Sequence, residues 1–305
     1  MTGHRAVAWD GLSLAVPAGW EPARLGLGYL FLEDSLGPRL TLRWQRQKGP
    51  LEPEAVLKRL ARSGIVGRSD ATEAMAGDDS RDAAAAWLGA LPEAWRALPC
   101  SDASGRGGHA VLFVIPGEHL DELAVLAAPH PRPGEDAAIW ARAAASLAPA
   151  PPGEFSLYDV RGRAPSGFRL TSFAVQLGHF HFRYASRTGT LEYHRFAPAE
   201  AILRGKTLEG WAGDVFAREL GKPRRFEMEC FGGLPSAGFQ DFRSGGLAKA
   251  VRVLAAGVFA SARFVRVLVW RPDQARIFAV VARHAGGLSR ESFEEVCRRY
   301  VAQTP

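Results

Sequence analysis

Three histidines have the residue types and spacing that come closest to a chemical site in this sequence. His179 and His181 alternate with Phe180 and Phe182, and His194 follows a short polar turn. Successive side chains of a β-strand point to opposite faces, so the two histidines share one face and the phenylalanines take the other, which we expect to be the core face. If the two segments pair as a hairpin, His194 lies opposite His181, and three imidazoles share one surface.

Neutral imidazoles on adjacent strands can bind zinc or a similar ion, or they can form a proton-sensitive patch. If the turn spans Ser186 to Gly189, Glu192 lies opposite Arg183 and is the only acidic residue that the hairpin adds to this face. One carboxylate cannot orient three rings, and no fourth ligand is evident. We therefore predict that the three histidines form a polar face of the sheet or a weak metal site, and not an obligatory one.

A second candidate site is a group of arginines in the C-terminal half, interleaved with apolar and aromatic residues. Residues 1–150 hold 15 Lys and Arg against 18 Asp and Glu, whereas residues 151–305 hold 23 against 14. This asymmetry favours an acidic protein or an anionic ligand as the partner of the second half. Nucleic acid is disfavoured, because no recognised nucleic-acid-binding motif accompanies the charge. The residues that we predict to bind the partner are Arg224, Arg225, Arg252, Arg263 and Arg266; the alternative is that they only form a solvated rim around an apolar core.

The sequence predicts no catalytic residue. Cys100, Cys230 and Cys297 are far apart and form no CxxC pair, which is typical of a protein from a reducing compartment. The glycine cluster at 105–108 matches neither common phosphate-binding motif, and no GxSxG motif occurs. We therefore expect no cofactor, and we keep a metal-dependent enzyme that uses the three histidines as the alternative function.

The length of 305 residues and one proline-rich segment indicate two domains. Leu147–Gly153 reads LAPAPPG, and three prolines with a glycine can neither continue a helix nor join a sheet. We place the boundary there, which predicts domains at 1–150 and 151–305. The N-terminus shows no apolar segment behind a basic start, and the longest apolar stretch is interrupted by basic residues. We thus expect a cytoplasmic protein without a membrane span.

The two halves repeat one order of elements: a proline-glycine turn with an aromatic residue, a hairpin, a short helix, a second hairpin and a closing helix. The turns are Val16–Trp20 (VPAGW) and Ala164–Phe168 (APSGF), and the short helices begin near Pro53 and Ala199. Hairpins, not alternating strands and helices, dominate both halves. The pattern predicts an α+β protein of two tandem duplicated domains, each a largely antiparallel sheet packed with helices.

This order of features resembles the PsbP-like fold, in which a strand leads through a proline-glycine-tryptophan turn to a meander, and a helix follows the final hairpin. The resemblance covers most of both halves, although Phe168 replaces the tryptophan in the second one. Proteins of that fold are mainly binding and assembly factors, among them an extrinsic photosystem subunit, a small-GTPase release factor and secretion chaperones. The resemblance implies a non-catalytic binding or adaptor protein, and it carries over no catalytic residue.

Overall fold

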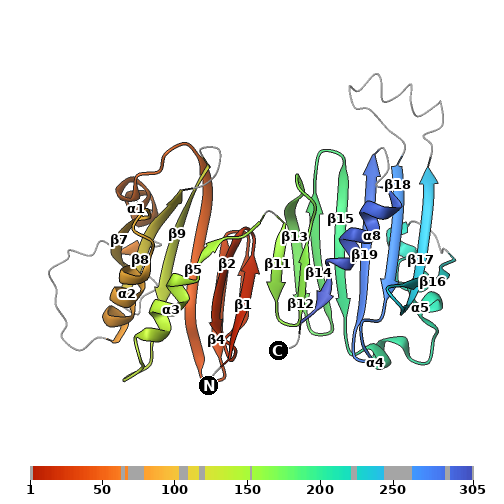
Figure 1. Cartoon of the computed structure of the whole chain (residues 1–305), viewed down its shortest axis with the longest axis horizontal. Coiled ribbons are helices and arrows are strands. Elements are labelled where there is room, and N and C mark those ends of the chain that lie inside the picture. The colour runs from red at the N-terminus through yellow and green to blue at the C-terminus, as the bar shows by residue number, and fades with distance from the viewer. Residues whose placement is uncertain are drawn as a thin grey trace. The chain divides into compact units, whose positions relative to one another are not determined.

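The structure is a computed structural model that describes residues 3–62, 66–67, 79–102, 109–116, 121–151, 153–220, 225–243, 263–285 and 289–303. The chain divides into two compact units (Figure 1). The first comprises Met1–Pro151 with Phe155–Tyr158 and Pro305, and the second comprises Pro152–Glu154 and Asp159–Thr304. Strand β11 (Glu154–Leu157), which follows the proline-rich segment, pairs with β1 (His4–Trp9) of the first unit.

The first unit contains a seven-stranded sheet in the order β3-β4-β5-β9-β8-β7-β6, and all of its neighbouring strands are antiparallel. Its strands are β3 (Glu21–Gly26), β4 (Tyr29–Asp34), β5 (Gly37–Lys48), β6 (Val66–Gly67), β7 (Arg96–Asp102), β8 (His109–Pro116) and β9 (Asp121–Pro129). A smaller group of strands in this unit consists of β10 (Ala148–Pro149), β2 (Leu12–Pro17), β1 (His4–Trp9) and β11.

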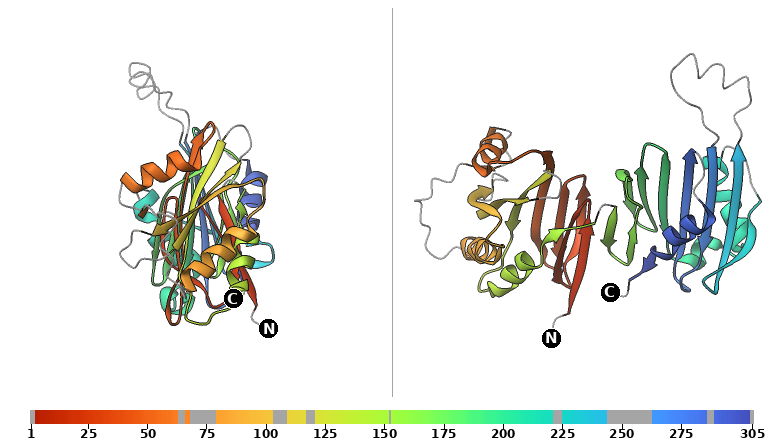
Figure 2. Two further views of the ribbon diagram at one scale, coloured as in Figure 1. Left: turned by 90° about the vertical axis from the view of Figure 1, so that its left-hand side faces the viewer. Right: turned by 45° about the horizontal axis from the view of Figure 1, so that its top comes forward.

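Helices cover both faces of this sheet, as the end-on view in Figure 2 shows for α1 and α2. Helix α1 (Pro53–Arg62) packs through Val56 onto a core that includes Leu112 and Leu126. Helix α2 (Asp79–Ala90) contacts β8, β9 and the closing helix α3 (Ala138–Ala145). The sheet is therefore buried on both sides, which explains why β8 reads as a continuous apolar run.

A buried arginine lies at the centre of the first unit. Trp20, from the proline-glycine turn, packs against Trp140 of α3 with ring centroids 5.0 Å apart. The guanidinium carbon of Arg39 lies 4.9 Å and 5.4 Å from the centroids of these two rings. The same guanidinium forms ion pairs with Asp34 and Glu135, and the Arg39 side chain is only 1% exposed. Strand β5 is thus tied to α3 through a charge enclosed by aromatic rings.

The second unit contains another antiparallel seven-stranded sheet, in the order β13-β14-β15-β19-β18-β17-β16. Its strands are β13 (Arg169–Gln176), β14 (His179–Ala185), β15 (Gly189–Phe196), β16 (Glu227–Phe231), β17 (Leu234–Arg243), β18 (Arg263–Trp270) and β19 (Ile277–Ala285). The remaining elements are β12 (Val160–Arg163), paired with β20 (Val301–Ala302), and helices α4 (Ala199–Leu203), α5 (Leu208–Val215), α6 (Ala217–Leu220) and α8 (Arg290–Arg298).

Two cores lie on the two faces of the second sheet. On one face, Trp211 of α5 and Phe216 pack with Phe196 and with apolar residues of β18 and β19. On the other face, aromatic contacts connect Trp270 with Tyr300, the residue that follows α8 and its cap. Thr207 starts α5, and its hydroxyl accepts a hydrogen bond from a backbone N–H of the first turn, as N-cap residues do.

The prediction of an α+β protein with antiparallel sheets is confirmed, and the two large sheets have the same strand order. The proline-glycine turns also agree in detail. The backbone N–H of Trp20 donates to the carbonyl of Pro17, and the N–H of Phe168 donates to the carbonyl of Pro165. Both aromatic side chains are buried. In the part of the chain that the structure describes, no helix is long and apolar enough to cross a membrane.

Candidate functional site

The three predicted histidines lie together on the hairpin β14–β15 of the second unit. His181 pairs with His194 and Arg183 pairs with Glu192, so the register is the one that the alternation and the turn predict. The imidazole rings of His181 and His194 are nearly parallel, with centroids 4.5 Å apart. The ring of His179 stacks on Phe196 in the same way, at 4.3 Å. The two cross-strand pairs form a ladder of parallel rings.

The histidine face of the hairpin is covered, although we expected the opposite face alone to be the core. His194 is 2% exposed and Glu192 is 5% exposed. The ring of Phe216, which caps the C-terminal end of α5, meets the ring of His194 edge-on at 5.6 Å. The other face is buried as well, because Phe182 and Tyr193 are completely inaccessible to solvent. The histidines are therefore part of a core, with His179 and His181 at its margin.

Glu192 is the centre of the polar contacts. Its Oε2 lies 3.1 Å from Nε2 of His181 and 3.8 Å from Nε2 of His194. Its Oε1 accepts a hydrogen bond of 2.5 Å from Arg283 and lies 3.9 Å from Nε of Arg183. We name His179, His181, His194, Glu192 and Arg283 the histidine–glutamate cluster.

A further hydrogen bond connects the rings, since Nε2 of His179 lies 3.1 Å from Nδ1 of His194. The other ring nitrogen of His194, Nε2, is buried and has no hydrogen-bond partner among the described residues. A buried polar atom without a partner costs free energy, so its occurrence in a folded protein requires an explanation.

The electrostatics of the cluster keep the buried imidazoles neutral. Burial, together with the neighbouring His181, lowers the pKa of His179 from 6.5 to about 4. Burial lowers the pKa of His194 well below its usual value, with smaller contributions from the neighbouring histidines and Arg283. For Glu192, burial alone would raise the pKa, but the hydrogen bond from His181 and the charge of Arg283 outweigh it and lower the pKa. The cluster thus combines one carboxylate with the neutral imidazoles of His179 and His194, and carboxylates and neutral imidazoles are ligand types of zinc.

A group of described residues that could hold a metal ion differs in one member from the three predicted histidines. His181, Glu192 and His194 present one ligand atom each, all within 4.8 Å of one another. His179 does not belong to this group; its Nε2 bonds to Nδ1 of His194 instead. The sequence pattern had assigned Glu192 only a supporting role. Its two-residue spacing from His194 on the same strand was the signal that could have identified it as a ligand.

The predicted arginine site is only partly described. Arg224 and Arg252 lie outside the described residues, as does the side chain of Arg263, whose backbone belongs to β18. Arg225 is exposed. Arg266 is half-buried on the α8 face of the sheet, where its guanidinium carbon lies 5.6 Å from the ring of Phe293.

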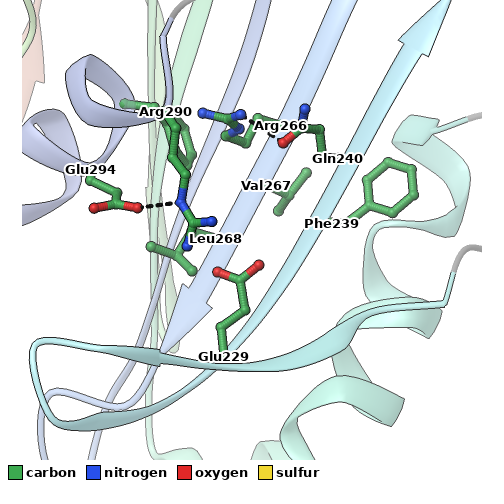
Figure 3. A pocket seen from close by; sticks show the side chains of 9 residues that line it. Glu229, Phe239, Gln240, Arg266, Val267, Leu268, Arg290 and Glu294 are labelled. Atoms are coloured by element: carbon green, nitrogen blue, oxygen red, sulfur yellow. Dashed lines mark hydrogen bonds and ion pairs between the residues drawn. The ribbon is translucent and has the colours of Figure 1, made fainter.

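Arg266 lies among acidic groups and does not belong to an open basic surface. It lines a small pocket of about 50 Å³ together with Glu229, Glu294 and Arg290 (Figure 3). It donates a hydrogen bond of 2.6 Å to Oε1 of Gln240, and Arg290 donates one of 2.7 Å to Glu294. Burial and the charge of Arg290 lower the pKa of Arg266. The negative charges of Glu229 and Glu294 weaken the electrostatic attraction between Arg266 and an acidic partner.

No protein-family model matches this chain, and no curated protein matches its sequence. The function of the molecule therefore has to follow from its own residues and their geometry.

Other arginines of the second unit are open to solvent. Arg169 at the start of β13 and Arg187 in the β14–β15 turn are exposed, and neither forms an ion pair within the described ranges. Arg169 pairs with Ala185 in the sheet, so Arg187 follows only two residues beyond this pair. Arg183 is 48% exposed and belongs to the same end of the sheet. These arginines lie outside the last strands, where the alternation of arginines with apolar and aromatic residues predicts the partner site.

Proposed function

We propose that the protein is a non-catalytic binding protein made of two tandem copies of one fold, and that its second copy binds an acidic protein segment. The common strand order of the two large sheets supports the duplication, as do the matching turns at Trp20 and Phe168. The resemblance to the PsbP-like fold, whose members are mainly binding and assembly factors, agrees with this role.

The observation that carries the proposal is the positive charge at one end of the second sheet. Arg169 and Arg187, which form no ion pair within the described ranges, lie there through the pairing of β13 with β14, and Arg183, which also faces Glu192, lies at the same end. Exposed cations without acidic neighbours gain the most from an incoming carboxylate, because no existing ion pair has to be broken. The net charge of residues 151–305 acts in the same direction and speeds association with an acidic partner.

Binding of a fluorescent glutamate-rich peptide to the full chain tests the proposal. We expect the affinity to fall steeply as salt rises, because exposed charges are screened over about 10 Å at 0.1 M ionic strength. The double variant Arg169→Glu/Arg187→Glu should weaken binding at least tenfold and flatten the salt dependence. Arg24→Glu, which reverses an exposed arginine of the first unit, is the matched control and should change the affinity less than twofold.

Two results would contradict the proposal. If both variants weakened binding equally, the charge of the whole chain and not this end of the sheet would attract the peptide. If single-stranded DNA bound more tightly than the peptide at the same salt concentration, the partner would be nucleic acid.

A further inference from the structure

The histidine–glutamate cluster contains a buried nitrogen that points at a carboxylate oxygen without bonding to it. Nε2 of His194 lies 3.8 Å from Oε2 of Glu192, too far for a hydrogen bond. It has no other hydrogen-bond partner in the described part of the chain. Nε2 of His181 approaches the same oxygen to 3.1 Å. Two ring nitrogens and one carboxylate oxygen therefore lie within 4.8 Å of one another.

We propose that His181, His194 and Glu192 bind one Zn²⁺ ion, with a water molecule as the fourth ligand. Zinc–nitrogen and zinc–oxygen bonds are 2.0–2.2 Å long, so ligand atoms of a tetrahedral site lie about 3.3–3.5 Å apart. The two distances from Oε2 of Glu192, 3.1 Å and 3.8 Å, lie on either side of this range. The rings of His181 and His194 are stacked nearly parallel, and an imidazole binds a metal in its own plane, so the ring of His181 has to turn for both lone pairs to face the ion.

The residues around His194 and Glu192 hold these two ligands in the form that a metal requires. If Nδ1 of His194 donates its hydrogen to Nε2 of His179, the lone pair of His194 is on Nε2, the atom that faces Glu192. Arg283 occupies Oε1 of Glu192, whereas Oε2 bonds to Nε2 of His181, a bond that the ion would replace. Metal-binding histidines and carboxylates are usually oriented by such outer contacts.

The donor set also indicates which ion binds and how tightly. Calcium and magnesium prefer oxygen ligands only, whereas two imidazoles with one carboxylate suit zinc. The positive charges of Arg283 and Arg183 oppose a cation, because both guanidinium groups approach Oε1 of Glu192. We therefore expect micromolar binding and not the much higher affinity of a structural zinc site. This agrees with the prediction from sequence that the histidines do not form an obligatory metal site.

Titration of the chelator-treated full chain with Zn²⁺, followed by calorimetry, tests the proposal. Wild type should bind one equivalent with micromolar affinity. His181→Asn and Glu192→Gln each remove a ligand and should weaken this binding at least tenfold. His179→Phe keeps a ring that can stack on Phe196, but loses the bond to His194, and should weaken binding about tenfold, as loss of an outer contact does. His284→Asn, a histidine outside the cluster that bonds to Thr188, is the matched control and should bind as wild type does.

Cobalt(II) substitution keeps the proposal testable if a ligand variant fails to fold. Wild type loaded with cobalt should show the intense visible absorption of a four-coordinate ion, and an excess of zinc should abolish it. Wild type without saturable zinc binding, a cobalt spectrum typical of six-coordinate hydrated ions, or equal affinity in Glu192→Gln and His284→Asn would each overturn the proposal. None of these results depends on whether the chain binds an acidic peptide.

Discussion

Replacing Arg39 with methionine should destabilise the first unit by about 3–5 kcal/mol, the usual cost of removing one partner from a buried ion pair. The side chain of Arg39 is 1% exposed and lies over the rings of Trp20 and Trp140. Methionine fills much of the same volume, so the loss comes mainly from charge. Glu135 loses its ion-pair partner, and the two cation–π contacts contribute about 1 kcal/mol or more. Asp34 loses less, because a second arginine also pairs with it.

Urea denaturation of the full chain, followed by tryptophan fluorescence and circular dichroism, measures this cost. The two units can unfold separately, so the two transitions have to be fitted independently. Arg43→Met on the same strand is the control: Arg43 is exposed, its guanidinium carbon lies 5.0 Å from the ring of Tyr29, and its loss should cost less than about 1 kcal/mol. Adding Glu135→Gln to Arg39→Met should restore part of the stability, because an uncharged amide then replaces the carboxylate that has lost its arginine partner. Equal losses in the two single variants would refute the reasoning.

Three further predictions concern the second unit. Phe216→Ala should lower the free energy of unfolding by about 3–5 kcal/mol and expose His194, because the ring of Phe216 is buried and covers the imidazole. Urea denaturation measures this loss, and a loss below about 1 kcal/mol would mean that the ring does not support this core. Burial raises the pKa of Tyr193 and Tyr300 well above 10, so the stability that depends on their neutral forms is present below about pH 10 and lost as the pH rises above it. Ultraviolet absorbance should accordingly show these two tyrosines ionising only when the unit unfolds, and their ionisation in the folded state would contradict this. Thr207→Ala should lower the stability by about 1 kcal/mol through loss of the α5 N-cap, measured by thermal unfolding, whereas an unchanged melting temperature would show that the cap is dispensable.

The alternation of residues in β14 and β15 was enough to predict the pairing of His181 with His194. A period of two assigns each side chain to a face, and a turn from Ser186 to Gly189 gives the register that the structure has. Both the alternation and the turn depend only on residues close together in the sequence, so both can be predicted from the sequence alone. The same holds for the turns at Trp20 and Phe168, which depend on residues within five positions of each other.

The burial of the histidine face could not be predicted in the same way. It depends on Phe216, which reaches the sheet only after α5 has formed and packed. The contact of Arg283 with Glu192 joins residues 91 positions apart and exists only because β15 pairs with β19. Periodicity within a segment contains no information about such long-range partners. For that reason the burial of Glu192 and its contact with Arg283 were visible only in the structure.

Two sheets with the same strand order in one chain create a problem of mispairing during folding. Strand β5 has to find β9 and β15 has to find β19, and chains with similar neighbouring domains are prone to exchange such partners. The buried ion pair of Glu192 with Arg283 opposes this error. Strand β9 reads DELAVLAAP and contains no arginine, so a hybrid of β15 with β9 would enclose the carboxylate of Glu192 without that cation. Removing one partner of a buried ion pair costs about 3–5 kcal/mol, which penalises the wrong partner once this face of the sheet is covered.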